Sequence, residues 1–248
     1  MVKGLDTFQK YFADYEEQYV LIGGAACDIL FESNEVNFRA TRDLDMVLIV
    51  EALTPEFGEK FWEFIVDGKY RNKATNGSNP QFYRFDKPEE DKFPKMIELF
   101  CRSDFKLKDA KGITPIHIDD EVSSLSAILL NDDYYKALLN GKEVRNGLSV
   151  LRPEYIILFK AKAYLDLKRQ KDLGEKVDSS DIKKHKKDVL RIASELMLEK
   201  VEELPIAVDA DIHSFIDLLE QEPFDQNSLK RYGLKNENVV ELLKRVFG

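Results

Sequence analysis

The stretch Arg42-Asp43-Leu44-Asp45-Met46-Val47-Leu48-Ile49-Val50 decides how this chain is expected to fold. It is an apolar run rich in Val, Leu and Ile, which is typical of a β-strand. Because strand side chains alternate between two faces, we expect Asp43 and Asp45 on one face and Leu44 and Met46 in the core on the other. Two carboxylates on one face repel each other unless a cation lies between them, and Mg²⁺ binds carboxylates together with substrate phosphates. The alternative is a pair of solvent-exposed aspartates at the start of a strand.

The segment upstream strengthens the metal interpretation. Residues 19–22 form a short apolar run that ends in Gly23 and Gly24, and a helix is expected from residue 24 to residue 32. A strand that turns through glycines into a helix lets the backbone approach a ligand closely, and N–H groups at a helix start favour phosphate. The alternative is a tight turn without a ligand. Together with the two carboxylates downstream, the glycines predict a phosphate-binding turn beside a metal site.

A third acid lies in a later apolar run, Lys95-Met96-Ile97-Glu98-Leu99-Phe100-Cys101. Alternation places Glu98 on the face opposite Ile97 and Leu99. A carboxylate within a strand costs free energy unless it is paired or bound to a metal. The alternative is a half-exposed strand on which Glu98 faces solvent. With Asp43 and Asp45, Glu98 would complete the carboxylate set of a two-metal site.

The order Gly23-Gly24, Asp43-Leu44-Asp45 and then Glu98 resembles the nucleotidyltransferase superfamily that includes DNA polymerase beta. The phrase Leu21-Ile22-Gly23-Gly24-Ala25-Ala26, followed by Arg39-Ala40-Thr41-Arg42-Asp43-Leu44-Asp45, is similar to the AbiEii-like toxins of type IV toxin–antitoxin systems. The resemblance covers the first hundred residues well and the remainder loosely. It implies an α+β fold, with a nucleotidyltransferase-type mixed β-sheet flanked by helices and followed by a helical C-terminal part.

The resemblance also implies Mg²⁺-dependent transfer of a nucleotide from a nucleoside triphosphate to an acceptor hydroxyl, with two ions bound. Asp43 and Asp45 would hold Mg²⁺, and Glu98 would bind the second ion or act as the general base. Gly23 and Gly24 would cradle the β- and γ-phosphates through backbone N–H groups. Arg42, like Arg39, flanks the site and either contacts phosphate or pairs with nearby acids at the surface.

Two residues of the C-terminal part match the resemblance. Toxins of this branch use a lysine on a later helix to bind the triphosphate, and Lys162 is the preferred match, with Lys160 close behind. The alternative is a lysine whose ammonium group reaches the surface of its domain. The run Lys184-His185-Lys186-Lys187-Asp188 resembles a second family feature, which would place Asp188 near the site. A structural ion pair of Asp188 with Lys184 or Lys162 is the alternative.

The sequence does not identify the acceptor of the nucleotide. The toxin-like resemblance suggests tRNA or a protein side chain as acceptor, and a cognate antitoxin as partner. A small-molecule acceptor, as in nucleotidyltransferases that inactivate antibiotics, is an alternative within the same enzyme class. A non-catalytic module that binds a nucleotide or a partner protein is a hypothesis of another class, which the three intact acids disfavour.

Composition limits these hypotheses. The chain has 248 residues, enough for one large or two small domains, and we expect a boundary near residue 152, giving parts 1–152 and 153–248. No segment is apolar for long enough to span a membrane. Cys27 and Cys101 lie in expected core elements, which indicates a reduced, cytoplasmic protein. His117, His185 and His213 are scattered and do not suggest a zinc site.

The net charge of −9 argues against indiscriminate binding of nucleic acid, but not against a local basic groove. The basic run at residues 183–187 is interpreted mainly as a solvated helix face, since at most two or three of its side chains could reach one ligand.

Local patterns predict the remaining elements. Helices are expected at residues 7–18, 56–66, 153–170, 181–199, 209–220 and 237–247, and strands at 81–85, 94–101, 116–118 and 124–130. Residues 72–80 and 171–178 are expected to be loops, as is the segment 141–150, which leads to one more strand. The aromatic stripe on residues 56–66 is interpreted as core.

Overall fold

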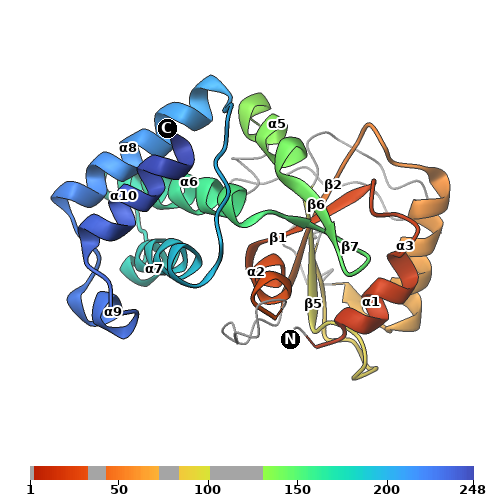
Figure 1. Ribbon diagram of the computed structural model, residues 1–248. Helices are drawn as coiled ribbons and strands as arrows, with labels where there is room; N and C mark the ends of the chain where they lie inside the picture. The colour runs from red at the N-terminus through yellow and green to blue at the C-terminus, as the bar shows by residue number, and fades with distance from the viewer. Residues whose placement is uncertain (1–2, 33–42, 73–83, 101–130) are drawn as a thin grey trace. The chain divides into compact units, whose positions relative to one another are not determined.

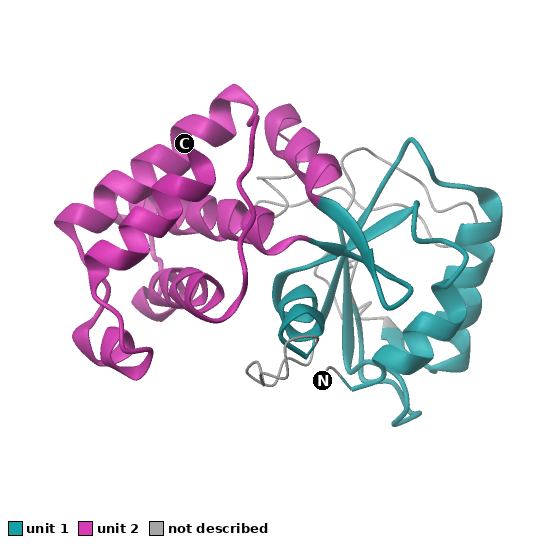
Figure 2. Cartoon of the chain, viewed as in Figure 1, with its two compact units in different colours: residues 1–122, 142–151 teal, residues 123–141, 152–248 magenta. Residues whose placement is uncertain are grey.

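The computed structural model describes residues 3–32, 43–72, 84–100 and 131–248. The chain divides into two compact units, residues 1–122 with 142–151, and residues 123–141 with 152–248 (Figure 2). The second unit therefore includes residues 123–141, which lie in the sequence between the two segments of the first unit. The division into 1–152 and 153–248 as separate domains stays a prediction, since compactness does not test whether each part folds independently.

A mixed sheet forms the centre of the first unit. In the described residues it has 7 strands in the order β3-β4-β5-β2-β1-β7-β6 (Figure 1). The central strand β2 is antiparallel to β1 and parallel to β5, and β1 is parallel to β7. The strand bounds are β1 Tyr19–Ile22, β2 Asp43–Leu48, β3 Arg71–Asn72, β4 Arg84–Asp86, β5 Met96–Phe100, β6 Lys142–Arg145 and β7 Leu148–Leu151.

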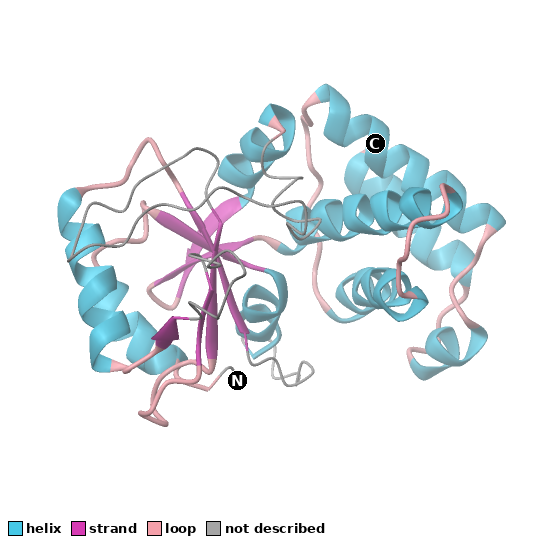
Figure 3. Ribbon diagram, turned by 180° about the vertical axis from the view of Figure 1, so that it is seen from behind, coloured by secondary structure: helices cyan, strands magenta, loops and turns pink. Residues whose placement is uncertain are grey.

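Among the residues that the structure describes, three helices cover the two faces of this sheet. Helices α1 (Leu5–Phe12) and α3 (Pro55–Asp67) lie on one side, and α2 (Gly23–Glu32) lies on the other (Figures 1 and 3). The α1/α3 side holds an aromatic core, in which the Phe8 ring lies 5.5 Å from the Tyr19 ring and the Phe61 ring lies 5.5 Å from the Phe85 ring. The aromatic stripe of α3 is therefore core, as expected. These findings confirm the α+β class with a mixed sheet flanked by helices.

The strand register shows which residues share a face. Tyr19 pairs with Leu48 and Leu21 with Met46, while Leu44 and Ile97 are partners across β2 and β5. Partners on neighbouring strands point to the same side, so these residues face the aromatic core together with Phe85. The alternate residues, including Asp43, Asp45 and Glu98, consequently face the side on which α2 packs.

Two sequence expectations in this unit are wrong. The first helix ends at Phe12 rather than at residue 18, because successive turns, in which Tyr15 N–H donates to Phe12 O and Gln18 N–H to Tyr15 O, carry the chain into β1. The segment 141–150 is not a loop: it contains β6 and β7, joined through Asn146 and Gly147. Both of these residues have positive φ angles, 51° and 69°.

The second unit is helical in its described residues. Its helices are α5 (Asp132–Gly141), α6 (Pro153–Asp172), α7 (Ser179–Glu195), α8 (Ile206–Gln221), α9 (Gln226–Arg231) and α10 (Asn236–Phe247). This confirms the helical C-terminal part. Helix α7 ends at Glu195 rather than near residue 199, because Leu196 adopts extended backbone angles. The strands expected at 116–118 and 124–130 lie outside the described residues. None of the described helices is long and apolar enough to cross a membrane.

Candidate active site

Three carboxylates that the sequence singled out face the same side of the sheet. Asp45 of β2 is the register partner of Glu98 of β5, and Asp43 lies two residues earlier on β2. All three are partly exposed, while the alternate residues Leu44, Met46, Ile97 and Leu99 are buried. Because neighbouring strands lie about 4.8 Å apart, Asp45 and Glu98 stand side by side. The parallel pairing of β2 with β5 thus unites acids that are far apart in the sequence.

The first glycine of the Gly-Gly pair lies directly against this row. Ile22, the last residue of β1, is the register partner of Asp45, so the chain passes Asp45 as it enters α2. Gly23 has a φ of +61°, in the left-handed region that side chains rarely adopt. A Cβ at Gly23 would lie 2.3 Å from Oδ2 of Asp45. Glycine is therefore required here both by the backbone angle and by the approach of the carboxylate.

The next glycine is buried within α2, whose N-terminus starts at this point. The first N–H groups of a helix carry partial positive charge, which favours a carboxylate or a phosphate beside them by about 0.3–1 kcal/mol. The start of α2 therefore lies beside the Asp45 carboxylate. The binding of phosphate by Gly23 and Gly24 stays a prediction.

The donor set suits a hard cation, since Mg²⁺ prefers carboxylate oxygens. Asp43, Asp45 and Glu98 share a face, and the contact of Asp45 with the Gly23 backbone fixes the position of one carboxylate relative to α2. Within the described residues, however, no three His, Cys, Asp or Glu side chains lie close enough together to hold one ion. Ligation by all three acids therefore requires side-chain rotation.

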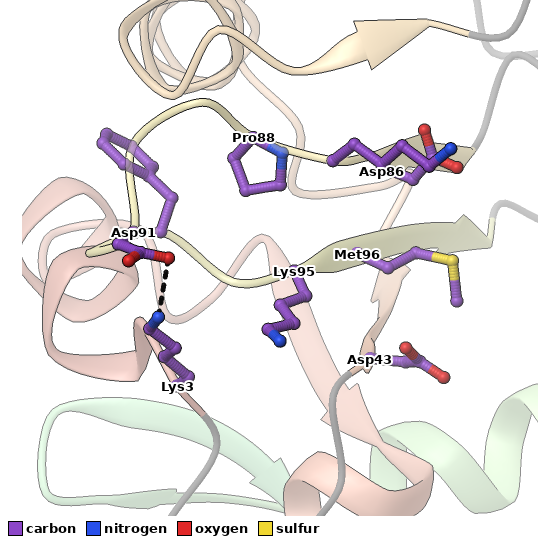
Figure 4. A pocket seen from close by; sticks show the side chains of 9 residues that line it. Lys3, Asp43, Asp86, Pro88, Asp91, Lys95 and Met96 are labelled. Carbon is purple, nitrogen blue, oxygen red and sulfur yellow. Dashed lines mark hydrogen bonds and ion pairs between the residues drawn. The ribbon is translucent and has the colours of Figure 1, made fainter.

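A cavity of about 350 Å³ adjoins the carboxylates at Asp43 (Figure 4). Its other walls come from Lys3 and from the segment between β4 and β5, here called the β4–β5 arch (residues 87–95). Asp86 of β4 also lines the cavity, and Met96 is the register partner of both Asp86 and Asp43. Sequence reasoning missed Asp86, although an acid that follows the aromatic alternation of residues 81–85 was a usable signal.

The β4–β5 arch is anchored to the core of the unit. The N–H of Lys87 donates to the carbonyl of Lys95 at 3.1 Å and closes the arch at its base. The Tyr70 hydroxyl donates to Pro94 O at 2.5 Å, and the Thr7 hydroxyl donates to Lys92 O at 2.7 Å. The Phe93 ring is buried and packs edge-on against Phe64 with ring centroids 4.9 Å apart. The arch is therefore a fixed wall of the cavity.

The other predicted site residues lie in the second unit or outside the described residues. Lys162 of α6 forms ion pairs with Asp166 at 3.0 Å and Asp211 at 3.2 Å. Burial lowers the pKa of Lys162, but these two carboxylates outweigh it and raise the pKa above its ordinary value. Arg42, Arg39, Cys101 and His117 lie outside the described residues.

Lys160 and Asp188 form a buried ion pair, with Nζ and Oδ2 2.9 Å apart and side-chain exposures of 11% and 7%. This pair joins α6 to α7. The sequence suggested Lys184 or Lys162 as the structural partner of Asp188, but the ion pair that the structure shows is with Lys160.

Most of the basic run at residues 183–187 forms a solvated helix face, as expected. Lys183, Lys184 and Lys187 are exposed on α7. Lys186 instead donates to the carbonyls of Glu222 and Pro223 just beyond α8, and burial lowers its pKa. One lysine of the run thus has a structural role, and three remain on the surface.

A comparison with solved structures agrees with this architecture. The chain is similar to the crystal structure of an antigenic nucleotidyltransferase-like protein from Paracoccidioides brasiliensis, at 15% identity and a TM-score of 0.50. The match covers 98% of this chain and 94% of that chain. The fold is nucleotidyltransferase-like. No family model matches the sequence, and no curated protein matches it either.

Proposed function

We propose that this chain is a Mg²⁺-dependent nucleotidyltransferase. The observation that carries the proposal is the row of Asp43, Asp45 and Glu98 on one face of β2 and β5, with Gly23 against Asp45. Three carboxylates on one sheet face cost free energy unless a cation binds them. The neighbouring start of α2 suits a phosphate. The nucleotidyltransferase-like fold supports the same class of reaction.

In this proposal Asp43 and Asp45 hold Mg²⁺, and Glu98 holds a second ion or serves as the general base. The bound cation would supply charge neutralisation on the triphosphate. The acceptor oxygen attacks the α-phosphorus, a new O–P bond forms, and the bond from the α-phosphorus to the α,β-bridging oxygen breaks. Pyrophosphate leaves with that bonding pair, and a Glu98 acting as base takes the acceptor proton. Positioning and electrostatics supply most of the rate.

The remaining predicted residues have supporting roles in the proposal. The backbone N–H groups of Gly23 and Gly24 bind the β- and γ-phosphates, and Arg42 contacts phosphate at the edge of the site. Lys162 neutralises charge on the leaving pyrophosphate, in exchange for its ion pairs with Asp166 and Asp211. Asp188 acts indirectly, because its partner is Lys160.

The finer identity that we propose is an AbiEii-like toxin of a type IV toxin–antitoxin system, with tRNA or a protein side chain as acceptor and a cognate antitoxin as partner. The support is the sequence phrase around Gly23-Gly24 and Asp43-Leu44-Asp45. A small-molecule acceptor and a non-catalytic module are the competing outcomes of the following experiment.

The experiment incubates the purified chain with Mg²⁺, each α-labelled nucleoside triphosphate in turn and total bacterial tRNA. Asp43→Asn/Asp45→Asn is compared with Asp217→Asn, an exposed aspartate on α8 that serves as the matched control. The proposal expects label on RNA or protein with the unmodified chain and with Asp217→Asn, and none with the double variant. Labelling that survives in the double variant contradicts it.

Two further outcomes identify the alternatives. Nucleotide binding without labelled macromolecules, accompanied by a labelled small product when candidate drugs are added, indicates a small-molecule acceptor. Neither labelling nor nucleotide binding contradicts the enzyme proposal and favours a non-catalytic module.

A further inference from the structure

The cavity beside Asp43 is lined by three lysines, Lys3, Lys87 and Lys95. Lys87 and Lys95 stand at the two ends of the β4–β5 arch, line the cavity and are exposed. Lys95 is labelled in Figure 4. Lys3, the third lysine of the cavity, is held by Asp91 at 2.8 Å. Among the described residues, by contrast, neither Lys87 nor Lys95 forms an ion pair. Two lysine charges are thus available on a wall that the core holds in place.

The other charges of the cavity make the local balance depend on the metal. The lining has three lysines, Lys3, Lys87 and Lys95, and three aspartates, Asp43, Asp86 and Asp91; Lys3 pairs with Asp91, on which the charge of Lys95 also acts. When Asp43 ligates a cation, its charge is neutralised and the cavity becomes net positive. An anion is then the ligand that complements the arch, and the two lysines supply the N–H donors for it.

We propose that this cavity receives a phosphate group of the acceptor, held by Lys87 and Lys95. The inference rests on the proposed function, because it places the acceptor hydroxyl beside Asp43, Asp45 and Glu98. The phosphate belongs either to the backbone of a nucleic acid or to a small phosphorylated molecule. In both cases the cavity binds the part of the acceptor next to the reacting hydroxyl, and the triphosphate binds elsewhere on the carboxylate row.

The test measures binding rather than transfer. A fluorescein-labelled short single-stranded RNA is titrated with the full chain in Mg²⁺ at low salt, and fluorescence anisotropy is followed. Glycerol 3-phosphate is tested in parallel by calorimetry. The variants are Lys87→Gln/Lys95→Gln and the matched control Lys92→Gln, an exposed lysine of the same arch that does not line the cavity.

The double variant is expected to weaken binding by about tenfold or more, and to lower the slope of log K against log salt by about 0.7 for each lost phosphate contact on a single strand. Lys92→Gln is expected to bind like the unmodified chain. Lysine-dependent binding of RNA assigns the phosphate to a nucleic acid, and lysine-dependent binding of glycerol 3-phosphate alone assigns it to a small molecule. Equal binding by the double variant and Lys92→Gln, or no binding of either probe, overturns the proposal.

Adding the nucleotidyl-transfer assay, with the same lysine variants, separates this proposal from the proposed function. If the chain transfers no nucleotide and yet binds phosphate through Lys87 and Lys95, the function fails and the phosphate site stands. If the chain transfers nucleotide and the Michaelis constant for the acceptor is the same in Lys87→Gln/Lys95→Gln as in the unmodified chain, the phosphate site fails and the function stands.

Discussion

Replacing Gly23 by alanine tests the contact between the start of α2 and the carboxylate row. The new methyl group would lie 2.3 Å from Oδ2 of Asp45, at a position whose φ of +61° already disfavours a side chain. The carboxylate is the flexible partner in this overlap, so Asp45 is expected to rotate away while the strand stays in place. The substitution should therefore disturb a proposed metal ligand more than it disturbs the fold.

The magnitude follows from two contributions. The left-handed conformation costs about 1–2 kcal/mol for a residue other than glycine. Displacement of Asp45 from its rotamer adds about 0.5–1.5 kcal/mol. Loss of the support of a metal ligand weakens metal binding by roughly 10–100-fold in other proteins, and we expect a similar loss here.

Gly233 provides a matched control. Its φ is +65°, close to that of Gly23, and a Cβ there meets nothing within 4 Å. Gly233→Ala should therefore show the backbone cost alone. Urea unfolding would measure the stability of both variants, and calorimetric titration with Mg²⁺ or Mn²⁺ would measure metal affinity.

The expected result is that both substitutions destabilise the chain and that only Gly23→Ala loses metal affinity and nucleotidyl transfer. A double-mutant cycle with Asp45→Ala should reduce the cost of Gly23→Ala to that of Gly233→Ala, since the overlap is gone. If Gly23→Ala retains the metal affinity and transfer of Gly233→Ala, the inferred support of Asp45 by Gly23 is refuted.

Three other predictions concern the second unit. Lys160→Met should destabilise the chain by about 3–5 kcal/mol in urea unfolding, because it leaves the buried Asp188 carboxylate without its lysine, and unchanged stability would contradict this. Asp133→Ala should cost about 1 kcal/mol, since Asp133 Oδ2 accepts the N–H of Ala207 at 2.9 Å at the start of α8; Asp217→Asn is the control and should cost nothing measurable. Bonds to the Asp209 and Gly248 carbonyls raise the pKa of His213, so its stabilisation is fully present below the unfolded pKa near 6.5 and is lost as pH rises through the folded pKa. The free energy of unfolding, measured between pH 5.5 and 8, should show this fall with rising pH in the unmodified chain and not in His213→Gln. An identical pH dependence in the two proteins would contradict the assignment.

The local pattern of the site could be read from the sequence, but its assembly could not. Alternation along residues 43–48 correctly predicted that Asp43 and Asp45 share a face, because a buried strand face selects apolar residues at every second position. That Asp45 stands beside Glu98 depends on parallel pairing between strands separated by β3 and β4. No local signal determines such a partner.

Other errors had usable signals. The hairpin of β6 and β7 turns through Asn146-Gly147, a pair that strongly favours two-residue loops with positive φ angles. Helix α5 was not predicted from the sequence, although it follows Asn131, whose side chain accepts the N–H of Asp133 at 2.9 Å, as an N-terminal capping residue does. The overlong first helix arose because Tyr15 continues the helical spacing of Phe8 and Phe12, although the chain turns after Phe12.

The most direct test of the central claim compares transfer of label from α-labelled and γ-labelled nucleoside triphosphate, in Mg²⁺, by the unmodified chain and by Glu98→Gln. The acceptor is expected to gain α-label and no γ-label, pyrophosphate is expected to be released in equal amount, and Glu98→Gln is expected to lose this activity. Transfer of γ-label, or full α-label transfer by Glu98→Gln, would contradict the assignment of the carboxylate row to nucleotidyl transfer.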